Sequence, residues 1–223
     1  MKIRKIVPVG DQAVSVMFEE KIDLKVNQKV QKLHRFLKEH KIQGIRESIP
    51  SYCSLLIFYD PLQISYKKVT SIVKKVKDDM QDIDHQNNRM IEIPVVYGGK
   101  YGEDLETVAV YAGMSQEEVI QIHTEPVYYV YQIGFLPGFP YLGGLDPRIH
   151  APRLANPRLE IPAGSVGIGG EQTGIYPLAS PGGWQLIGRT PLALYQKDRE
   201  PPVLLQAGDR VKFVRIREED ANF

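Results

Sequence analysis

The sequence has a single cysteine, Cys53, among its 223 residues, which excludes an internal disulfide bond. It also has no apolar run long enough to span a membrane. The first residues, MKIRKIVPVGDQAV, lack the apolar region and the cleavage site of a secretory signal peptide. A protein without disulfides, membrane spans or a signal peptide is expected in the reducing cytoplasm.

The chain also lacks an excess of either charge, because its 28 Lys and Arg residues nearly balance its 27 Asp and Glu residues. This balance gives no indication of nucleic-acid binding, and the aromatic residues are not interleaved with a basic stripe. Residues 1–90 nevertheless carry +6 (17 basic, 11 acidic), and residues 91–223 carry −5 (11 basic, 16 acidic). A solvated, lysine-rich helix face is the favoured explanation, and contact with an acidic partner is the alternative.

Familiar catalytic and metal-binding motifs are also absent. The five histidines are scattered, without the paired spacing of metal ligands. Ser165 lies in AGSVG, where Ala163 replaces the first glycine of a nucleophile elbow. GGEQTGI lacks the lysine of a phosphate-binding loop, because Ile175 follows Gly174. The sequence therefore predicts neither a metal site nor a chain that catalyses by itself.

Apolar periodicity predicts the order β-β-α-β-β-α in the N-terminal part of the chain. Two helices packed on one face of a small sheet is the simplest arrangement of these elements. The polar, aperiodic segment 77–90 is the predicted linker. The expected elements are strands at 2–9, 13–18, 45–50 and 53–59, a helix from Asp23 to near Gly44, and a helix that begins at Ser65.

The second part of the chain begins with a predicted strand at 91–98 and two predicted helices. The first helix covers 103–112, and the second begins at Ser115, which has capping-box spacing to Glu118. From Tyr128 onward, short apolar strands alternate with Gly/Pro turns, which is typical of a barrel or a sandwich.

The segment 161–191, IPAGSVGIGGEQTGIYPLASPGGWQLIGRTP, combines many glycines with apolar side chains and little charge. Apolar walls with a few polar groups are typical of a small-molecule or peptide site, and arginine offers a planar fork for carboxylate or phosphate. The alternative is a barrel with tight corners, whose arginines pair with Glu160 and Glu171. The candidate substrate-binding residues are Arg153, Arg158, Gln172, Thr173, Tyr176, Ser180, Gln185 and Arg189, and the candidate apolar walls are Phe135, Phe139, Tyr141, Tyr176 and Trp184.

Three long blocks are GFLPGFPYLGGLDPR at 134–148, APRLANPRLEIPAGSVGIGGEQTGIYP at 151–177 and SPGGWQLIGRTP at 180–191. They resemble the signature blocks of the 5-oxoprolinase B-subunit family, also called the KipI or allophanate hydrolase subunit 1 family. VPVGDQAVSVMF at 7–18 and MSQEEVIQIHTEPVY at 114–128 fit the same family. The resemblance covers essentially the whole chain.

The resemblance implies an α+β protein with a small α/β N-terminal domain (1–84) and a cyclophilin-like β-barrel domain (85–223). It implies two partners, the KipA-like C subunit and the A subunit of 5-oxoprolinase, in a complex that opens 5-oxo-L-proline to L-glutamate. ATP with Mg²⁺ would be used at the level of this complex, and the chain alone is expected to be inactive. One family member inhibits a sporulation sensor histidine kinase, so a kinase inhibitor is the alternative function.

The resemblance also implies a surface that faces a partner protein. The candidate partner-binding residues are Phe139, Tyr141 and Trp184, because exposed apolar patches mark interaction sites. Trp184 follows SPGG, so its ring either folds back into the barrel core or joins this patch. Prolyl isomerase activity is a third possibility that a barrel fold alone suggests, and the sequence shows no sign of its active-site pattern.

Overall fold

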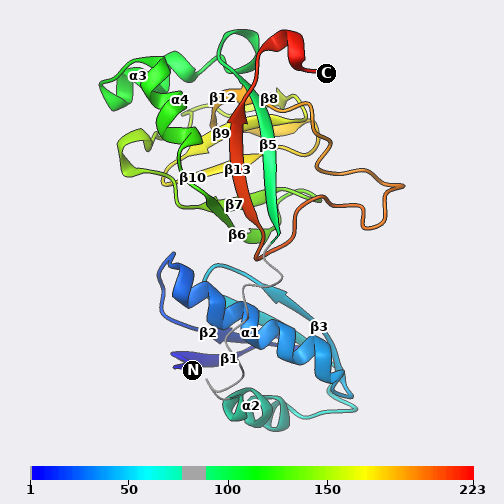
Figure 1. The fold of residues 1–223 in the computed structure, drawn as a ribbon. Helices are drawn as coiled ribbons and strands as arrows, with labels where there is room; N and C mark the ends of the chain where they lie inside the picture. The colour runs from blue at the N-terminus through cyan, green and yellow to red at the C-terminus, as the bar shows by residue number, and fades with distance from the viewer. Residues whose placement is uncertain (1, 77–88) are drawn as a thin grey trace. The chain divides into compact units, whose positions relative to one another are not determined.

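The computed structural model describes residues 2–76 and 89–223 of the chain (Figure 1). By its internal contacts the chain divides into two units, Met1–Asn87 and Asn88–Phe223. Nearly all of the predicted linker and the predicted boundary between residues 84 and 85 lie outside the described residues, so both stay predictions. No helix in the described part of the chain is long and apolar enough to cross a membrane.

The N-terminal unit is a four-stranded antiparallel sheet with two helices, in the predicted order. The strand order across the sheet is β1-β2-β4-β3. Alternate residues of the two central strands are buried, and apolar side chains of both helices join them in one core, as expected for helices on one face of a sheet. The elements are β1 (Lys5–Val9), β2 (Ala13–Met17), α1 (Leu24–His40), β3 (Ile45–Pro50), β4 (Ser54–Tyr59) and α2 (Tyr66–Lys75).

Side-chain caps set where the two helices of this unit begin. Asp23 accepts hydrogen bonds from two backbone N–H groups in the first turn of α1, and Ser65 accepts one in the first turn of α2. The predicted end of the first helix near Gly44 is slightly late. Lys41 already takes a left-handed conformation, with φ of 40°, and this ends α1 at His40.

Seven strands of the C-terminal unit close into a barrel with the order β10-β7-β6-β13-β5-β12-β9, which decides between the predicted barrel and sandwich. Neighbouring strands are antiparallel except β5 and β13, which run parallel (Figure 1). Two further strands, β8 and β11, pair with each other in a separate ribbon. The strands are β5 (Met90–Tyr97), β6 (Tyr128–Ile133), β7 (Pro140–Gly143), β8 (Arg158–Ile161), β9 (Ser165–Gly169), β10 (Gln172–Ile175), β11 (Ser180–Gly182), β12 (Gln185–Arg189) and β13 (Arg210–Arg215).

Two α-helices pack on the barrel, and the sequence predicted both of them. The capping box between Ser115 and Glu118 is formed as expected. Val108 and Val119 from the helices belong to the same buried cluster as Ile168 of the barrel. The described residues thus form a mixed α/β fold with a closed seven-stranded barrel, which confirms the predicted fold class at this level. The helices are α3 (Leu105–Ala112) and α4 (Gln116–Thr124), with 3₁₀ turns η2 (Gly99–Tyr101), η3 (Pro147–Ile149) and η4 (Glu218–Asp220).

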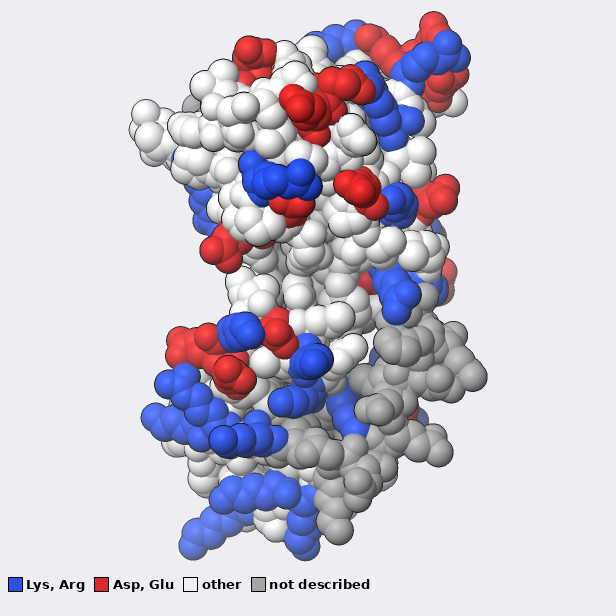
Figure 2. Space-filling view, turned by 60° about the vertical axis from the view of Figure 1, so that its left-hand side comes forward, with Lys and Arg blue, Asp and Glu red and all other residues white. Residues whose placement is uncertain are grey.

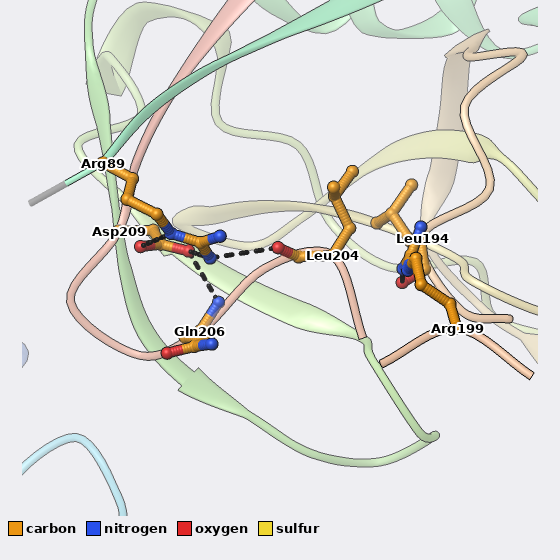
Figure 3. A network of polar contacts seen from close by, with 6 residues as sticks. All are labelled: Arg89, Leu194, Arg199, Leu204, Gln206 and Asp209. Atoms are coloured by element: carbon orange, nitrogen blue, oxygen red, sulfur yellow. Dashed lines mark hydrogen bonds and ion pairs between the residues drawn. The ribbon is translucent and has the colours of Figure 1, made fainter. Parts of the chain in front are cut away.

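An ion pair holds the starts of the two parallel strands together (Figure 3). Arg89, just before β5, donates from Nε and Nη2 to the two carboxylate oxygens of Asp209, just before β13, at 3.1 and 2.6 Å. The same guanidinium reaches the carbonyl oxygen of Leu204, and Asp209 also accepts from the backbone N–H of Gln206. The bidentate geometry fixes the register of two strands that lie far apart in the sequence.

His123 is fully buried inside the C-terminal unit. Its Nδ1 lies 2.8 Å from the hydroxyl of Tyr97, and its Nε2 lies 2.9 Å from Oγ1 of Thr173. Because Thr173 donates its own proton to the carbonyl oxygen of Gly167, Nε2 carries the imidazole proton and Nδ1 accepts from Tyr97. Burial lowers the pKa of His123 from 6.5 to about 3, so the ring is neutral. Thr173, a predicted substrate-binding residue, therefore belongs to the barrel interior.

Candidate functional site

A pocket of about 270 Å³ opens on the C-terminal unit, and five aromatic side chains form much of its wall. Separate segments contribute to it: the β6–β7 loop with β7, the loop before β8, the residue after β10, and the stretch from β11 to β12. We call it the aromatic pocket. It is lined by Phe135, Phe139, Tyr141, Arg153, Leu154, Pro157, Tyr176, Pro181, Gly182, Gly183 and Trp184.

Glycines in the barrel wall leave the space that these rings occupy. A Cβ atom on Gly169 would lie 2.5 Å from Nε1 of Trp184, and one on Gly174 would lie 3.0 Å from Cζ of Phe139. Both distances are shorter than the roughly 3.5–4.0 Å of a favourable carbon contact. The glycine-rich segment 161–191 is therefore not a flexible linker, since its glycines let large rings pack directly on the main chain.

Phe139 lies at the centre of the aromatic wall. Its ring meets those of Tyr141, Tyr176 and Trp184 edge to face, with centroids 4.9, 5.2 and 5.5 Å away. Each such pair contributes about 0.5–1.5 kcal/mol beyond the burial of apolar area. Phe139 and Tyr176 are 2% exposed and Trp184 is 5% exposed. Of the two alternatives for Trp184, the structure shows the ring folded back into the core of its own unit.

Phe135 differs from the other rings because it is 61% exposed at the rim of the pocket. Its backbone has φ of 64°, a left-handed conformation that is costly for a bulky side chain. Its ring still contacts Phe139 and Tyr176 edge to face, at 5.5 and 6.5 Å. Backbone strain of this kind clusters at binding and active sites, so it supports the assignment of the pocket as functional.

Arg153 supplies the charge of the pocket. Its guanidinium lies 5.9 Å from the ring centroid of Trp184, within the range of a cation–π contact. The side chain is exposed, and no carboxylate lies within ion-pair distance of it among residues 2–76 and 89–223. Its planar fork therefore remains available to a carboxylate or phosphate ligand.

The two phenols of the pocket are neutral hydrogen-bonding groups. Burial raises the pKa of Tyr141 and of Tyr176, and Arg153 opposes this shift only in part. Both hydroxyls thus keep their protons at neutral pH and can act as donors. The lining contains no Ser, Cys, His, Lys, Asp or Glu side chain, and Arg153 together with the two phenols equips the pocket to bind a small anion.

Comparisons with known proteins identify the family. Residues 4–205 match the family model described as "Carboxyltransferase domain, subdomain C and D". The B subunit of 5-oxoprolinase from Bacillus subtilis (strain 168) is 49% identical over an alignment of 227 positions, which covers 97% of this chain and 94% of that protein. The chain belongs to the 5-oxoprolinase B-subunit family.

Solved structures share the fold of this chain. The crystal structure of TTHA0988 is similar with a TM-score of 0.83 and 38% identity over 92% of this chain, which spans 40% of that longer chain. The urea carboxylase of Kluyveromyces lactis has a TM-score of 0.72 over 98% of this chain and 23% of its own length, and at 23% identity it shows a shared fold alone. None of these proteins is named as a kinase inhibitor, so that alternative function is not supported.

Arg158 forms ion pairs within the protein and does not line the aromatic pocket. Its Nη2 lies 2.7 Å from Oδ1 of Asp104, and its Nε lies 3.1 Å from Glu103. Asp104 also accepts a hydrogen bond of 2.6 Å from the backbone N–H of Leu186. The alternative in which the arginines pair with Glu160 and Glu171 does not hold for Arg158, which ties β8 to Asp104 at the start of α3, while Asp104 in turn binds β12.

Arg189 also lies outside the pocket lining. Its Nε donates to the carbonyl oxygen of Ala163 at 2.8 Å, and its guanidinium lies 5.1 Å from the ring centroid of Phe223. The alternative of a pairing with Glu160 or Glu171 does not hold for Arg189 either. A main-chain carbonyl at a turn and an aromatic ring near the C-terminus take the place of a carboxylate.

The remaining polar candidates do not line the pocket either. Gln185 is buried and donates from Nε2 to the carbonyl oxygen of Pro152, while Ser180 donates to the carbonyl oxygen of Pro181. Gln172 is half-buried at the start of β10. Of the predicted substrate-binding residues, the structure brings Arg153 and Tyr176 into the pocket.

All three partner-binding candidates, Phe139, Tyr141 and Trp184, line the pocket. The structure corrects one expectation, since Phe139 and Trp184 are buried and do not form an exposed patch. The sequence analysis missed Leu154 and Pro157 as wall residues. Their position next to Arg153 in the same loop was the available signal, but apolar loop residues are too common to be selected by it.

Proposed function

We propose that the chain is the B subunit of an ATP-dependent 5-oxoprolinase that acts with the A and C subunits to hydrolyse 5-oxo-L-proline to L-glutamate. The observation that carries this proposal is the 49% identity, over nearly the full length of both chains, with a protein named as the B subunit of 5-oxoprolinase. A cytoplasmic location fits a chain with a single cysteine.

The chemistry of the aromatic pocket supports a role in holding the substrate. 5-Oxoproline is a flat five-membered lactam that carries one carboxylate. Arg153 is placed to bind that carboxylate through its fork, while the rings of Phe139 and Trp184 border the space for the lactam. The protonated hydroxyl of Tyr176 is a donor for the lactam oxygen, where negative charge develops when the amide is attacked.

Other subunits must complete the reaction in this proposal. A lactam amide is resonance-stabilised, and transfer of a phosphoryl group from ATP to its oxygen would make a better electrophile. The pocket offers no nucleophile or general base, and it has no carboxylate that could hold the Mg²⁺ that accompanies ATP. We therefore expect the chain to be inactive alone, with ATP and Mg²⁺ bound by groups outside this pocket.

The same proposal includes the finer description of the fold and of the partner surface. A cyclophilin-like domain at 85–223, after an α/β domain at 1–84, is supported by the closed barrel and its two packed helices. The rim of the pocket is the proposed contact with the C subunit. Phe135 and Leu159, which are 61% and 91% exposed, are large apolar side chains at this rim and on the neighbouring strand β8.

Reconstitution tests this function. Purified chain should release no glutamate from 5-oxoproline, and addition of the A and C subunits with ATP and Mg²⁺ should give turnover. Arg153→Lys should raise KM at least tenfold, because a lysine keeps the charge but loses the planar fork. Arg148→Lys is the matched control, since Arg148 is exposed and pairs with Asp146 away from the pocket. Glutamate release by the chain alone, or an unchanged KM in Arg153→Lys, would contradict the proposal.

A further inference from the structure

The N-terminal unit has a cavity of its own, of about 620 Å³, between the C-terminal end of α1 and strand β3. The function proposed above uses no part of it. Lys38 and Lys41 line it from the end of α1, and His34 lines it from one turn earlier in the same helix. Arg46 and Ser48 line it from the strand. We call it the lysine cavity.

The positive charge of the lysine cavity is only partly neutralised. Lys38 and Lys41 are exposed, and no carboxylate pairs with either of them within the described parts of the chain. Arg46 pairs with Asp60 at 3.0 Å, and Glu47 is the only acidic side chain in the lining. The C-terminal end of a helix carries roughly half an elementary negative charge. The two unpaired lysines exceed the combined negative charge of Glu47 and the helix end, so the cavity retains a small positive potential.

The surroundings reinforce this potential. Residues 2–76 contain 15 Lys and Arg against 7 Asp and Glu, a difference of +8. Figure 2 shows blue side chains gathered over the N-terminal unit, in the lower part of the view. A concave site inside a field of one sign concentrates ligands of the opposite sign. A solvated helix face accounts for the exposure of these lysines, but not for their position around a cavity.

The walls also offer neutral groups for the rest of a ligand. His34 Nδ1 lies 2.8 Å from Ser48 Oγ, so these two half-buried side chains form a polar wall. Leu37 and Ile42 add apolar surface next to the lysines.

We propose that the lysine cavity binds a small organic phosphate, with Lys38 and Lys41 on the phosphate groups and the apolar wall on the organic part. The combination of unpaired cations with apolar surface favours this class over inorganic phosphate. The volume lies within the roughly 300–1,000 Å³ typical of small-molecule sites. The proposal concerns the N-terminal unit alone and does not rest on the 5-oxoprolinase assignment.

Titration calorimetry on the full chain, with ATP, adenosine and inorganic phosphate as probes at low salt, tests the proposal. ATP should bind, and adenosine and inorganic phosphate should each bind at least tenfold more weakly. The double variant Lys38→Gln/Lys41→Gln should lose at least tenfold in ATP affinity. Lys25→Gln is the matched control with an expected change below twofold, because Lys25 lies in the first turn of the same helix, about 20 Å away.

Three outcomes would overturn the proposal: no binding of ATP at millimolar concentration, an unchanged ATP affinity in the double variant, or adenosine binding as tight as that of ATP. Inorganic phosphate binding as tight as that of ATP would overturn the assignment of the organic part. Amide NMR signals of Ser48 and His34 should shift on ATP addition in the native chain and in Lys25→Gln, but not in the double variant. Because the titration uses this chain without its partners, its result is independent of turnover by the reconstituted complex.

Discussion

The aromatic pocket and the lysine cavity are built from side chains of opposite character. The aromatic pocket of the C-terminal unit consists of rings that are largely buried and that pack on glycines, with a single charge from Arg153 at its rim. The lysine cavity of the N-terminal unit is bordered by exposed side chains such as Lys38 and Lys41, which pair with no carboxylate in residues 2–76 and 89–223.

Because of this difference, the side chains of the aromatic pocket and those of the lysine cavity should contribute differently to stability and to binding. The rings of the aromatic pocket belong to a core cluster, so the same side chains that shape the pocket also stabilise the fold. The exposed lysines of the other cavity contribute almost nothing to folding, because water solvates them in both states. Substitutions of the buried rings in the pocket wall should therefore lower stability, whereas substitutions of the exposed Lys38 and Lys41 should lower ligand affinity and leave stability nearly unchanged.

The largest effect is expected at Trp184. Trp184→Ala should lower the free energy of unfolding by about 3–5 kcal/mol, because it removes a buried ring and leaves a cavity against Gly169 and Phe139. Phe135→Ala, at the exposed rim, should cost less than about 1 kcal/mol. Urea unfolding followed by circular dichroism measures both. Equal losses in the two variants would show that the wall is not part of the core.

The second largest effect compares two carboxylates, Glu103 and Asp104, that contact Arg158 but should contribute differently to stability. Asp104→Asn should cost about 1.5–3 kcal/mol, because this buried carboxylate accepts from both Arg158 and the backbone of Leu186. Glu103→Gln should cost less than about 1 kcal/mol, since Glu103 is 59% exposed. Thermal melts compare the two variants, and a larger loss in Glu103→Gln would reverse the assignment of the structural partner.

A pH effect of similar size is expected from His123 in the barrel interior. Its pKa is about 3 in the folded chain against an ordinary value of 6.5, so below pH 6.5 the unfolded chain binds a proton that the folded chain does not. Stability is therefore lost as the pH falls from 6.5 toward 3, by about 2 kcal/mol at pH 5. Urea unfolding at pH 7, 6 and 5 should show this slope, and His123→Asn should flatten it; an identical slope in the variant would refute the assignment.

The smallest change in stability is expected in the lysine cavity. Lys38→Gln/Lys41→Gln should change the free energy of unfolding by less than about 0.5 kcal/mol, because both side chains are exposed and take no part in the core. The measurement is the same urea titration that is used for Trp184→Ala. A loss above about 1 kcal/mol would mean that these lysines support the fold, and the proposed division between stability and binding would fail.

Local signals in the sequence predicted local structure well. Asp23, Ser65 and Ser115 cap helices where the sequence placed them, because a cap depends on groups within one turn of the chain. The long glycine-rich blocks indicated the family, which the comparisons confirm. The contacts of Arg158 and Arg189 were not predicted, because the sequence offered either a ligand or the nearby Glu160 and Glu171, and the structure shows Asp104 and the carbonyl oxygen of Ala163.

The candidate site was predicted only in part, because the contacts that decide which polar side chains face the pocket join segments that are distant in the sequence. Thr173, Gln185 and Ser180 have the chemistry of ligand-binding residues, yet all three are buried and bonded within the protein. Strand alternation places neighbouring residues on opposite faces of the barrel wall. Which face holds the ligand depends on barrel closure, and the sequence alone does not reveal it.

The sequence by itself determined the order of the elements, their caps and the family, since these follow from spacing within a few residues or from long matching blocks. Tertiary structure decided which side chain each arginine contacts. Arg158 finds Asp104, 54 residues away in the sequence, while Arg153 lies against Trp184 at the pocket. Folding also turned Trp184 inward, because Gly169 leaves room for its ring and burial removes that ring from water.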